Sequence, residues 1–325
     1  MLNLEGVSKV FSVGTFGAQR LHAVNDVTFQ VGDGEIISLI GESGSGKSTI
    51  GKMILRLLSI STGSIHFNGV DIASLKGSAL KDYYRHVQGV FQDPFSSYNP
   101  IFKADRIFHH IREEFHPGIG HAEWAARLEQ SLQAVGLNPA DVLDKYPHQL
   151  SGGQLQRFLI ARALLLETQF LVADEIISML DASTRIDVLN LLADLKARGL
   201  SILFITHDLS LGYYISERAA ILFQGCLVEV GSSERIFANP LHPYTRMLMA
   251  AVPRLDRKWG AGLDDELARV DRREPGHGCL YFSRCPVSEP ICAAYRPPLL
   301  EVEQDHAVAC IRYEEDRSPS SRVSQ

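Results

Sequence analysis

The chain has 325 residues, of which 45% are hydrophobic and 22% are charged, and its formal net charge is −6. This composition is typical of a folded globular protein and argues against intrinsic disorder. At about 150 residues per domain, the length predicts two domains or one large domain with an extension. Nucleic-acid-binding proteins usually carry an excess of basic residues, whereas this chain is net negative, so we expect no nucleic-acid partner.

Apolar runs in the chain are short. None approaches the ~18 residues needed to cross a bilayer, and the first residues, MLNLEG, lack the basic and apolar regions of a secretory signal. We therefore expect a cytosolic chain that reaches a membrane only through a partner. Because thiols are reduced in the cytosol, the five cysteines predict no disulfides.

Apolar periodicity and turn residues predict an α/β fold. Residues 24–31, the turn Gly32-Asp33-Gly34 and residues 35–40 predict a hairpin that leads into a buried strand. A helix is predicted at 47–58 from its apolar spacing. Asn68-Gly69 is a dipeptide favoured in tight turns and predicts a second hairpin.

The middle of the chain alternates helical and strand patterns. Helices are predicted at 107–115 and 123–135. A further helix at 184–196 separates two strongly apolar strands at 170–173 and 201–205. Two buried strands joined through a helix are typical of a parallel α/β sheet.

The composition changes towards the C-terminus. Residues 219–229 predict a last hairpin, and after Asn239-Pro240 prolines and cysteines become more frequent. The final segment is charged and rich in serine, which predicts disorder. The expected organisation is a domain at 1–238 with a helical subdomain at about 93–166, an extension at 239–313 and a disordered tail at 314–325.

Residues 41–49 read GESGSGKST and match the phosphate-binding loop G-x-x-x-x-G-K-[ST] between a predicted strand and a predicted helix. Backbone N–H groups of such a loop surround phosphate oxygens, and the helix dipole adds favourable charge. Lys47 is expected to reach the β- and γ-phosphates, and Ser48 to bind Mg²⁺. The flanking strand and helix disfavour the alternative, a glycine-rich turn with a chance lysine. The candidate nucleotide-binding residues are Gly41, Glu42, Ser43, Gly44, Ser45, Gly46, Lys47, Ser48 and Thr49.

Two carboxylates follow the apolar run FLVA at 170–173. This places Asp174 and Glu175 at the carboxyl end of a buried strand, where α/β sheets bind ligands. Asp174 suits the Mg²⁺ shell, and Glu175 suits the activation of the attacking water. A buried strand that ends in solvated acids is the alternative, and the phosphate-binding loop upstream in the same sheet argues against it. Hydrolysis of the bound nucleotide is therefore expected.

The segment LSGGQ at 150–154 precedes a predicted helix at about 154–166. A Ser-Gly-Gly turn at a helix N-terminus offers a hydroxyl and amides to an anion. In order and spacing with the two motifs above, Ser151, Gly152, Gly153 and Gln154 resemble the ABC signature sequence. Residues 1–235 are accordingly similar to the nucleotide-binding subunit of an ABC transporter. The resemblance implies a P-loop NTPase (RecA-like) α/β core, an antiparallel β subdomain and a helical signature subdomain.

The resemblance also implies roles for residues outside these motifs. Gln92 resembles the Q-loop glutamine, which touches Mg²⁺ or water and faces the membrane subunits. His207 resembles the switch histidine at the γ-phosphate, and Asp181 belongs to the D-loop. Phe11 resembles the aromatic that lies against adenine, with a core position as the alternative. The family usually has proline after the catalytic glutamate, whereas this chain has Ile176; the carboxylate remains, so hydrolysis is expected to survive.

The same resemblance implies partners. In ABC proteins, residues matching 41–49 of one subunit and 151–154 of its partner enclose one ATP, which implies a head-to-tail dimer with an identical or homologous ATPase. Two transmembrane permease subunits and an extracytoplasmic substrate-binding protein are also implied, with this chain at the cytoplasmic face of the cell membrane.

Longer segments resemble the oligopeptide, dipeptide and nickel importer ATPases, and in particular the F-type ATPase subunit of such systems. These segments are FQDPFSSYNP at 91–100, YPHQLSGG at 146–153, NPLHPYT at 239–245 and the cysteine-containing region 278–310. The expected function is ATP hydrolysis that powers import. The alternative is a soluble ABC ATPase of DNA repair or translation, which usually carries two cassettes or long coiled-coil insertions.

Four of the five cysteines lie close together in the extension. Cys279, Cys285, Cys292 and Cys310 are separated by five, six and seventeen residues. Structural zinc sites usually contain pairs separated by two to four residues, so zinc fits poorly. Four thiolates with a Cys-Pro step suit an iron–sulfur cluster, which some relatives carry, and a group of free structural thiols is the alternative. Cys226, on a predicted strand, is expected in the core.

Overall fold

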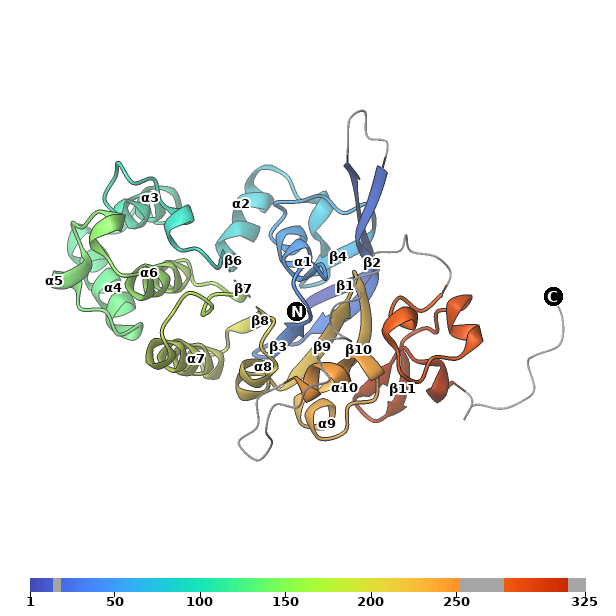
Figure 1. The fold of residues 1–325 in the computed structure, drawn as a ribbon. Coiled ribbons are helices and arrows are strands. Elements are labelled where there is room, and N and C mark those ends of the chain that lie inside the picture. Colours follow the sequence, from blue (N-terminus) through green and yellow to red (C-terminus); the bar gives the residue numbers. More distant parts are fainter. Residues whose placement is uncertain (14–18, 252–277, 315–325) are drawn as a thin grey trace.

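The computed structural model describes residues 1–13, 19–251 and 278–314, whose strands form two sheets (Figure 1). The smaller sheet is antiparallel, with the strand order β2-β1-β4-β5. Its strands are β1 (Leu2–Val13), β2 (Gln19–Val31), β4 (Thr62–Phe67) and β5 (Val70–Asp71).

The larger sheet has eight strands in the order β11-β12-β10-β9-β3-β8-β7-β6. Its members are β3 (Ile36–Ile40), β6 (Val87–Val90), β7 (Phe170–Asp174), β8 (Ser201–Thr206), β9 (Arg218–Phe223), β10 (Cys226–Ser232), β11 (Leu300–Glu303) and β12 (His306–Val308). Strands β6, β7, β8, β3 and β9 are parallel, and β10, β12 and β11 continue the sheet with antiparallel pairing.

Helices cover both faces of the larger sheet, and α3 to α6 form a separate group on the left of Figure 1. The α-helices are α1 (Lys47–Ile54), α2 (Gly77–His86), α3 (Arg106–Phe115), α4 (His121–Ala134), α5 (Pro139–Val142), α6 (Gly152–Leu165), α7 (Ala182–Ala197), α8 (Leu209–Ile215), α9 (Ser233–Ala238) and α10 (Pro243–Ala250). Short 3₁₀ helices include η5 (Phe282–Arg284) in the extension. No helix in these described ranges is long and apolar enough to cross a membrane.

Strand β3 shows why the central strands are continuously apolar. All five of its residues are buried. Ile37 and Leu39 pack in the same cluster as Ile50 of α1, whereas Ile40 packs with Leu209 of α8 in another cluster. A strand covered on both faces needs an apolar side chain at every position rather than at alternate ones.

The structure confirms most of the predicted elements. The strands predicted at 170–173 and 201–205 pair in parallel, and the hairpins at Asn68-Gly69 and 219–229 form as β4-β5 and β9-β10. The helix predicted at 47–58 ends earlier, at Ile54.

The hairpin predicted between residues 24–31 and 35–40 is wrong. Strand β2 pairs with β1 in the small sheet, whereas β3 pairs in parallel with β8 and β9 in the large sheet. The turn after Val31 therefore carries the chain from one sheet to the other. Two apolar runs close in sequence predict a hairpin only when neither has better partners elsewhere, and β3 has two parallel partners.

The C-terminal extension is joined to the core through the sheet. Strand β12 pairs with β10, with Glu229 opposite Val308, and β11 pairs with β12 at the sheet edge. The disordered tail predicted at 314–325 lies, after Glu314, outside the described residues.

Candidate functional site

The sequence motifs meet at one edge of the large sheet. Strands β3, β8, β7 and β6 are neighbours and run parallel. Their carboxyl ends lead into Gly41, His207, Glu175 and Gln92 respectively. The carboxyl edge of a parallel sheet is where α/β proteins bind ligands, because the loops that leave the strands converge there.

The phosphate-binding loop depends on glycine at two positions. A Cβ on Gly41 would lie 2.1 Å from the carbonyl oxygen of Leu222 on β9. Gly46 has a φ of +104°, and a Cβ there would lie 2.4 Å from the carbonyl oxygen of Ala23. The loop therefore packs directly against the backbone of two strands, which fixes its shape before any ligand binds.

Lys47 is buried and folds back over the loop. Its Nζ donates hydrogen bonds to the carbonyl oxygens of Gly41 at 2.7 Å and Glu42 at 2.8 Å. Burial lowers the pKa of Lys47, and the nearby carboxylates of Glu175 and Asp174 oppose that shift. The ammonium is therefore held at the mouth of the loop, where it can meet a phosphate.

Ser48 and Asp174 connect the loop to β7. The Ser48 hydroxyl donates a hydrogen bond of 2.9 Å to Oδ1 of Asp174. Burial raises the pKa of Asp174, although the Ser48 hydrogen bond lowers it and the Glu175 carboxylate raises it further. A hydroxyl and a carboxylate are hard oxygen ligands that suit Mg²⁺, which in nucleotide sites takes few protein ligands besides phosphates and water.

Glu175 and His207 contact each other at the ends of adjacent strands. His207 Nδ1 lies 3.3 Å from Oε1 of Glu175. Glu175 has a φ of +50°, which is uncommon for a residue with a side chain, and its N–H donates to the Ile205 carbonyl oxygen at 2.9 Å. Strained backbone of this kind concentrates at functional sites. Ile176 is 1% exposed, so this departure from the family pattern fills a core position.

The side chains of Gln92 and Phe11 are both accessible to solvent. Gln92 is exposed and follows β6, next to Phe91, whose carbonyl oxygen accepts a hydrogen bond from Gln156. Phe11 is half-buried on β1, and the Lys9 ammonium lies 5.1 Å from its ring centroid. The Phe11 ring thus keeps a solvent-accessible surface.

The signature segment begins α6. Ser151 Oγ accepts a hydrogen bond from the Gln154 N–H, and the Gln154 side chain accepts one from the Ser151 N–H, which together form a capping box. Asp181 caps α7 by accepting hydrogen bonds from the Ser183 hydroxyl and the Thr184 N–H. These bonds hold the pKa of the Asp181 carboxyl far below its usual range.

Residues Ser151 to Gln154 and Asp181 line one cavity of about 450 Å³. None of the described residues that line it belongs to the phosphate-binding loop. Figure 1 shows the same separation, because α6 lies in the helical group whereas α1, which follows the loop, packs at the centre of the molecule. Within one chain, the two anion-binding motifs face different spaces.

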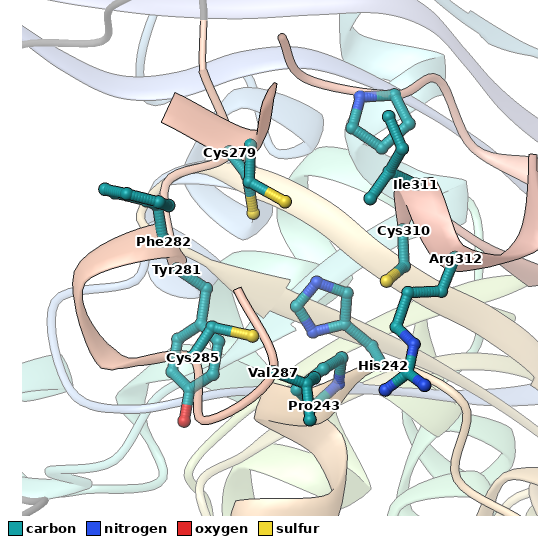
Figure 2. Close-up of a pocket in the computed structure, with 12 residues that line it drawn as sticks. His242, Pro243, Cys279, Tyr281, Phe282, Cys285, Val287, Cys310, Ile311 and Arg312 are labelled. Atoms are coloured by element: carbon teal, nitrogen blue, oxygen red, sulfur yellow. The ribbon is translucent and has the colours of Figure 1, made fainter. Parts of the chain in front are cut away.

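The four cysteines of the extension line a single pocket (Figure 2). Cys279, Cys285, Cys292 and Cys310 surround an apolar space of about 20 Å³, the size of one water molecule. Burial raises the pKa of Cys279 to about 11 and also raises the pKa values of Cys285 and Cys310. Burial therefore favours the neutral thiol over the thiolate at these three cysteines.

Two residues of the extension that sequence reasoning missed touch the phosphate-binding loop. The Glu42 N–H donates a hydrogen bond of 2.9 Å to the Tyr244 hydroxyl oxygen. Arg284 donates to both carboxylate oxygens of Glu42. Tyr244 lies in the segment NPLHPYT that the sequence singled out, whereas no local pattern marks Arg284.

Comparison with known proteins agrees with this architecture. Residues 24–178 match the ABC transporter family model, and residues 228–292 match the model of the oligopeptide/dipeptide transporter C-terminal region. The structure of the dimeric ATP-binding cassette MJ0796 bound to ADP and phosphate is 27% identical in sequence. It superposes with a TM-score of 0.64 and covers 72% of this chain and 99% of that chain.

Relatives that match along most of their length are more similar in sequence to this chain than MJ0796 is. A Brucella ovis protein is 41% identical over 318 residues, covering 96% of this chain and 98% of that protein. The oligopeptide transport ATP-binding protein AppF of Bacillus subtilis is 38% identical over 325 residues, covering 96% of this chain and 97% of AppF. The oligopeptide transport ATP-binding protein OppF of Salmonella typhimurium is 37% identical over 298 residues, covering 90% of this chain and 89% of OppF.

The phosphate-binding loop and two carboxylates at the sheet edge, the signature segment at the start of α6 and the match of residues 24–178 together define an ABC-type ATPase. Because residues 228–292 also match the oligopeptide/dipeptide transporter model, the class can be narrowed to one family. The chain belongs to the oligopeptide/dipeptide transport family of ABC transporter ATP-binding subunits. The predicted family and fold class are confirmed.

Proposed function

We propose that this chain binds and hydrolyses ATP to power peptide import through an ABC transporter. The observation that carries the proposal is the common sheet edge, where residues 41–49, Asp174, Glu175 and His207 lie at the carboxyl ends of neighbouring parallel strands. The similarity to OppF and AppF, both named as oligopeptide transport ATP-binding proteins, supports the transport role.

At this edge we assign a chemical role to each side chain. Lys47 and the loop N–H groups neutralise the β- and γ-phosphates. Ser48 and Asp174 would hold Mg²⁺, which when bound neutralises charge on the phosphates. Glu175 accepts the proton of the attacking water, and His207 orients the Glu175 carboxylate and contacts the γ-phosphate.

Two peripheral residues complete this assignment. The exposed position of Gln92 after β6 supports contact with Mg²⁺ or water on one side and with a permease subunit on the other. The half-buried ring of Phe11 supports stacking on the adenine base.

We infer that a second ATPase subunit completes the site. The cavity lined by Ser151 to Gln154 and Asp181 excludes residues 41–49 of the same chain. In a head-to-tail pair, the N-terminus of α6 of one subunit would meet the phosphates bound by the other. Two permease subunits and an extracytoplasmic binding protein complete the proposed transporter, with this chain at the cytoplasmic face of the membrane.

Reconstitution with the candidate permeases in proteoliposomes tests this function. We expect ATP-dependent uptake of labelled peptides, dependent on the binding protein and lost in Lys47→Ala. The alternative is a soluble ABC ATPase of DNA repair or translation. Two results together would favour that alternative over transport. The chain would be recovered as a dimer bound to ribosomes or DNA, and its rate of ATP hydrolysis would not change when permeases and binding protein are added.

For the cysteine pocket we propose an iron–sulfur cluster held by Cys279, Cys285, Cys292 and Cys310. Four thiols around one apolar pocket form a suitable donor set. Among the described residues, no three His, Cys, Asp or Glu side chains are grouped to hold a single metal ion. The cysteines also lack the pairs separated by two to four residues that structural zinc sites usually contain, so zinc fits poorly. Because the space between the four cysteines is only about 20 Å³, their side chains would have to move apart to admit a cluster.

A bound cluster would cross-link four positions of the extension. Iron and sulfide assays on anaerobically purified protein test its presence, with the visible absorbance of the same sample as a second readout. We expect Cys292→Ser to lose iron and Cys226→Ser to keep it, because Cys226 lies on β10 and contacts Arg296 instead. Iron-free protein with four titratable thiols in the extension would support the free-thiol alternative.

A further inference from the structure

The extension contacts the phosphate-binding loop through an ion pair between Arg284 and Glu42. Arg284 Nη1 lies 3.2 Å from Oε2 of Glu42, and Nη2 lies 2.9 Å from Oε1. The Arg284 side chain is 7% exposed and that of Glu42 is 35% exposed. A bidentate pair with this degree of burial has defined geometry, unlike most surface ion pairs.

Glu42 is held at each of its polar groups. Its carboxylate accepts from Arg284, its N–H donates to the Tyr244 hydroxyl oxygen, and its carbonyl oxygen accepts from Lys47. The carbonyl oxygen also accepts from the Ser45 N–H at 3.1 Å, so two of the four partners come from the extension. The conformation of Glu42 therefore depends in part on segments that follow it by 202 and 242 residues in the chain.

The charge of Glu42 explains why a cation is needed. The loop binds an anion, and a carboxylate within it repels phosphate through a Coulomb interaction that strengthens where water is excluded. The guanidinium of Arg284 offsets that repulsion. An arginine guanidinium is charged throughout the physiological pH range, so Arg284 supplies this positive charge at all times.

Arg284 is itself held between two aromatic rings, one from the extension and one from β9. Its guanidinium carbon lies 5.6 Å from the ring centroid of Tyr281 and 5.8 Å from that of Phe223. Tyr281 and Cys285, the residue that follows Arg284, both line the cysteine pocket. The segment that shapes this pocket is thus the segment that presents Arg284 to the loop.

We propose that Arg284 is a positioning residue for nucleotide binding, which acts by neutralising and orienting Glu42. The proposal rests on the nucleotide site at residues 41–49. Because linkage is reciprocal, ATP in the loop also stabilises the segment around Arg284. Binding of nucleotide and the conformation of the cysteine pocket are coupled through this ion pair.

A double-mutant cycle on the full chain tests the proposal, with the dissociation constant of ATP as the readout. Arg284→Met should weaken ATP binding about tenfold, because removal of one partner leaves the other charge uncompensated. In a Glu42→Gln background, the same Arg284→Met change should alter affinity less than about twofold. The KM for ATP should rise in Arg284→Met while kcat at saturating ATP is retained, because the ion pair affects binding and not the chemical step.

Arg235→Met is the matched control. Arg235 of α9 forms an exposed ion pair of 3.2 Å with Glu303 of β11, which belongs to the same extension as Arg284. This variant should bind ATP as the parent does. If Arg284→Met folds poorly, Arg284→Lys, which keeps the charge but loses the bidentate geometry, should give an intermediate affinity.

The coupling has its own readout. In protein shown by assay to be free of iron, ATP should slow alkylation of the free Cys285 thiol in the parent and have little effect on it in Arg284→Met. An equal loss of affinity with and without the Glu42→Gln change, or parent-like affinity in Arg284→Met, would overturn the proposal while leaving the ATPase function in place. Failure of the parent to bind ATP would instead refute the nucleotide site on which both depend.

Discussion

The imidazole Nδ1 of His207 lies 3.3 Å from Oε1 of Glu175. The two residues follow adjacent parallel strands, β8 and β7, and the Glu175 N–H is bonded to the carbonyl oxygen of Ile205 on β8. Their contact is therefore set by the sheet and not by a flexible loop. This placement supports the proposed role of Glu175 in the activation of water.

Glu175→Gln should remove hydrolysis and retain ATP binding. The amide keeps the shape of the side chain but cannot accept a proton, and loss of a general base costs about 10²- to 10⁴-fold in rate. Steady-state phosphate release with a parallel binding titration measures both quantities. Equal rates in parent and variant would show that another group activates the water. Glu234→Gln, a change in the first turn of α9, serves as the control.

Ser48→Ala should weaken Mg²⁺ binding and make the site more sensitive to pH. The Ser48 hydrogen bond lowers the pKa of Asp174, which burial raises, so its removal raises that pKa further. Mg²⁺ binds the ionised carboxylate, and protons therefore compete more strongly as pH falls. We expect the Mg²⁺ concentration for half-maximal activity to increase about tenfold at neutral pH, with a larger increase at acid pH. A pH-independent ratio would contradict this coupling.

Gly41→Ala should disrupt the loop. The new methyl group would lie 2.1 Å from the Leu222 carbonyl oxygen, so the loop or β9 must shift. Overpacking of this kind costs about 1–3 kcal/mol, and the displaced loop should lose most of its ATP affinity. Gly118→Ala is the control, because no atom lies within 4 Å of its added Cβ. Thermal denaturation and ATP titration of both variants check the prediction.

The sequence predicts features that depend on local chemistry. Residues 41–49 and 150–154 contain their own turn and cap signals, and the structure forms the Ser151 capping box at the start of α6. The parallel pairing of β7 with β8 also follows from two runs that are apolar at every position.

Contacts between distant parts of the chain are not predictable in the same way. Local patterns predict a hairpin between β3 and its neighbour in sequence, although its partners β8 and β9 lie more than 150 residues away. Arg284 and Glu42 are 242 residues apart. The residues next to Arg284 in the sequence do not indicate which distant carboxylate it contacts. Only the folded structure shows that its partner is Glu42.

Tyr83→Phe should lower stability at neutral pH and have a smaller effect at high pH. Tyr83 lies on α2, is 4% exposed, and donates a hydrogen bond of 2.5 Å to the carbonyl oxygen of Ile54. Loss of this bond costs about 1 kcal/mol. Burial raises the pKa of Tyr83 above its ordinary value of 10. Above pH 10 the unfolded phenol loses its proton while the folded one keeps it, so the unfolded state binds fewer protons.

The sign of the pH effect follows from this proton difference. With fewer protons on the unfolded state, the parent loses stability as pH rises above 10, by up to about 1.4 kcal/mol per pH unit from this group. Tyr83→Phe lacks that contribution, so the stability difference between parent and variant should shrink from pH 9 to pH 11. Urea unfolding across that range measures it, with the exposed Tyr213→Phe as control. A difference that stays constant with pH would show that the Tyr83 hydroxyl titrates alike in both states.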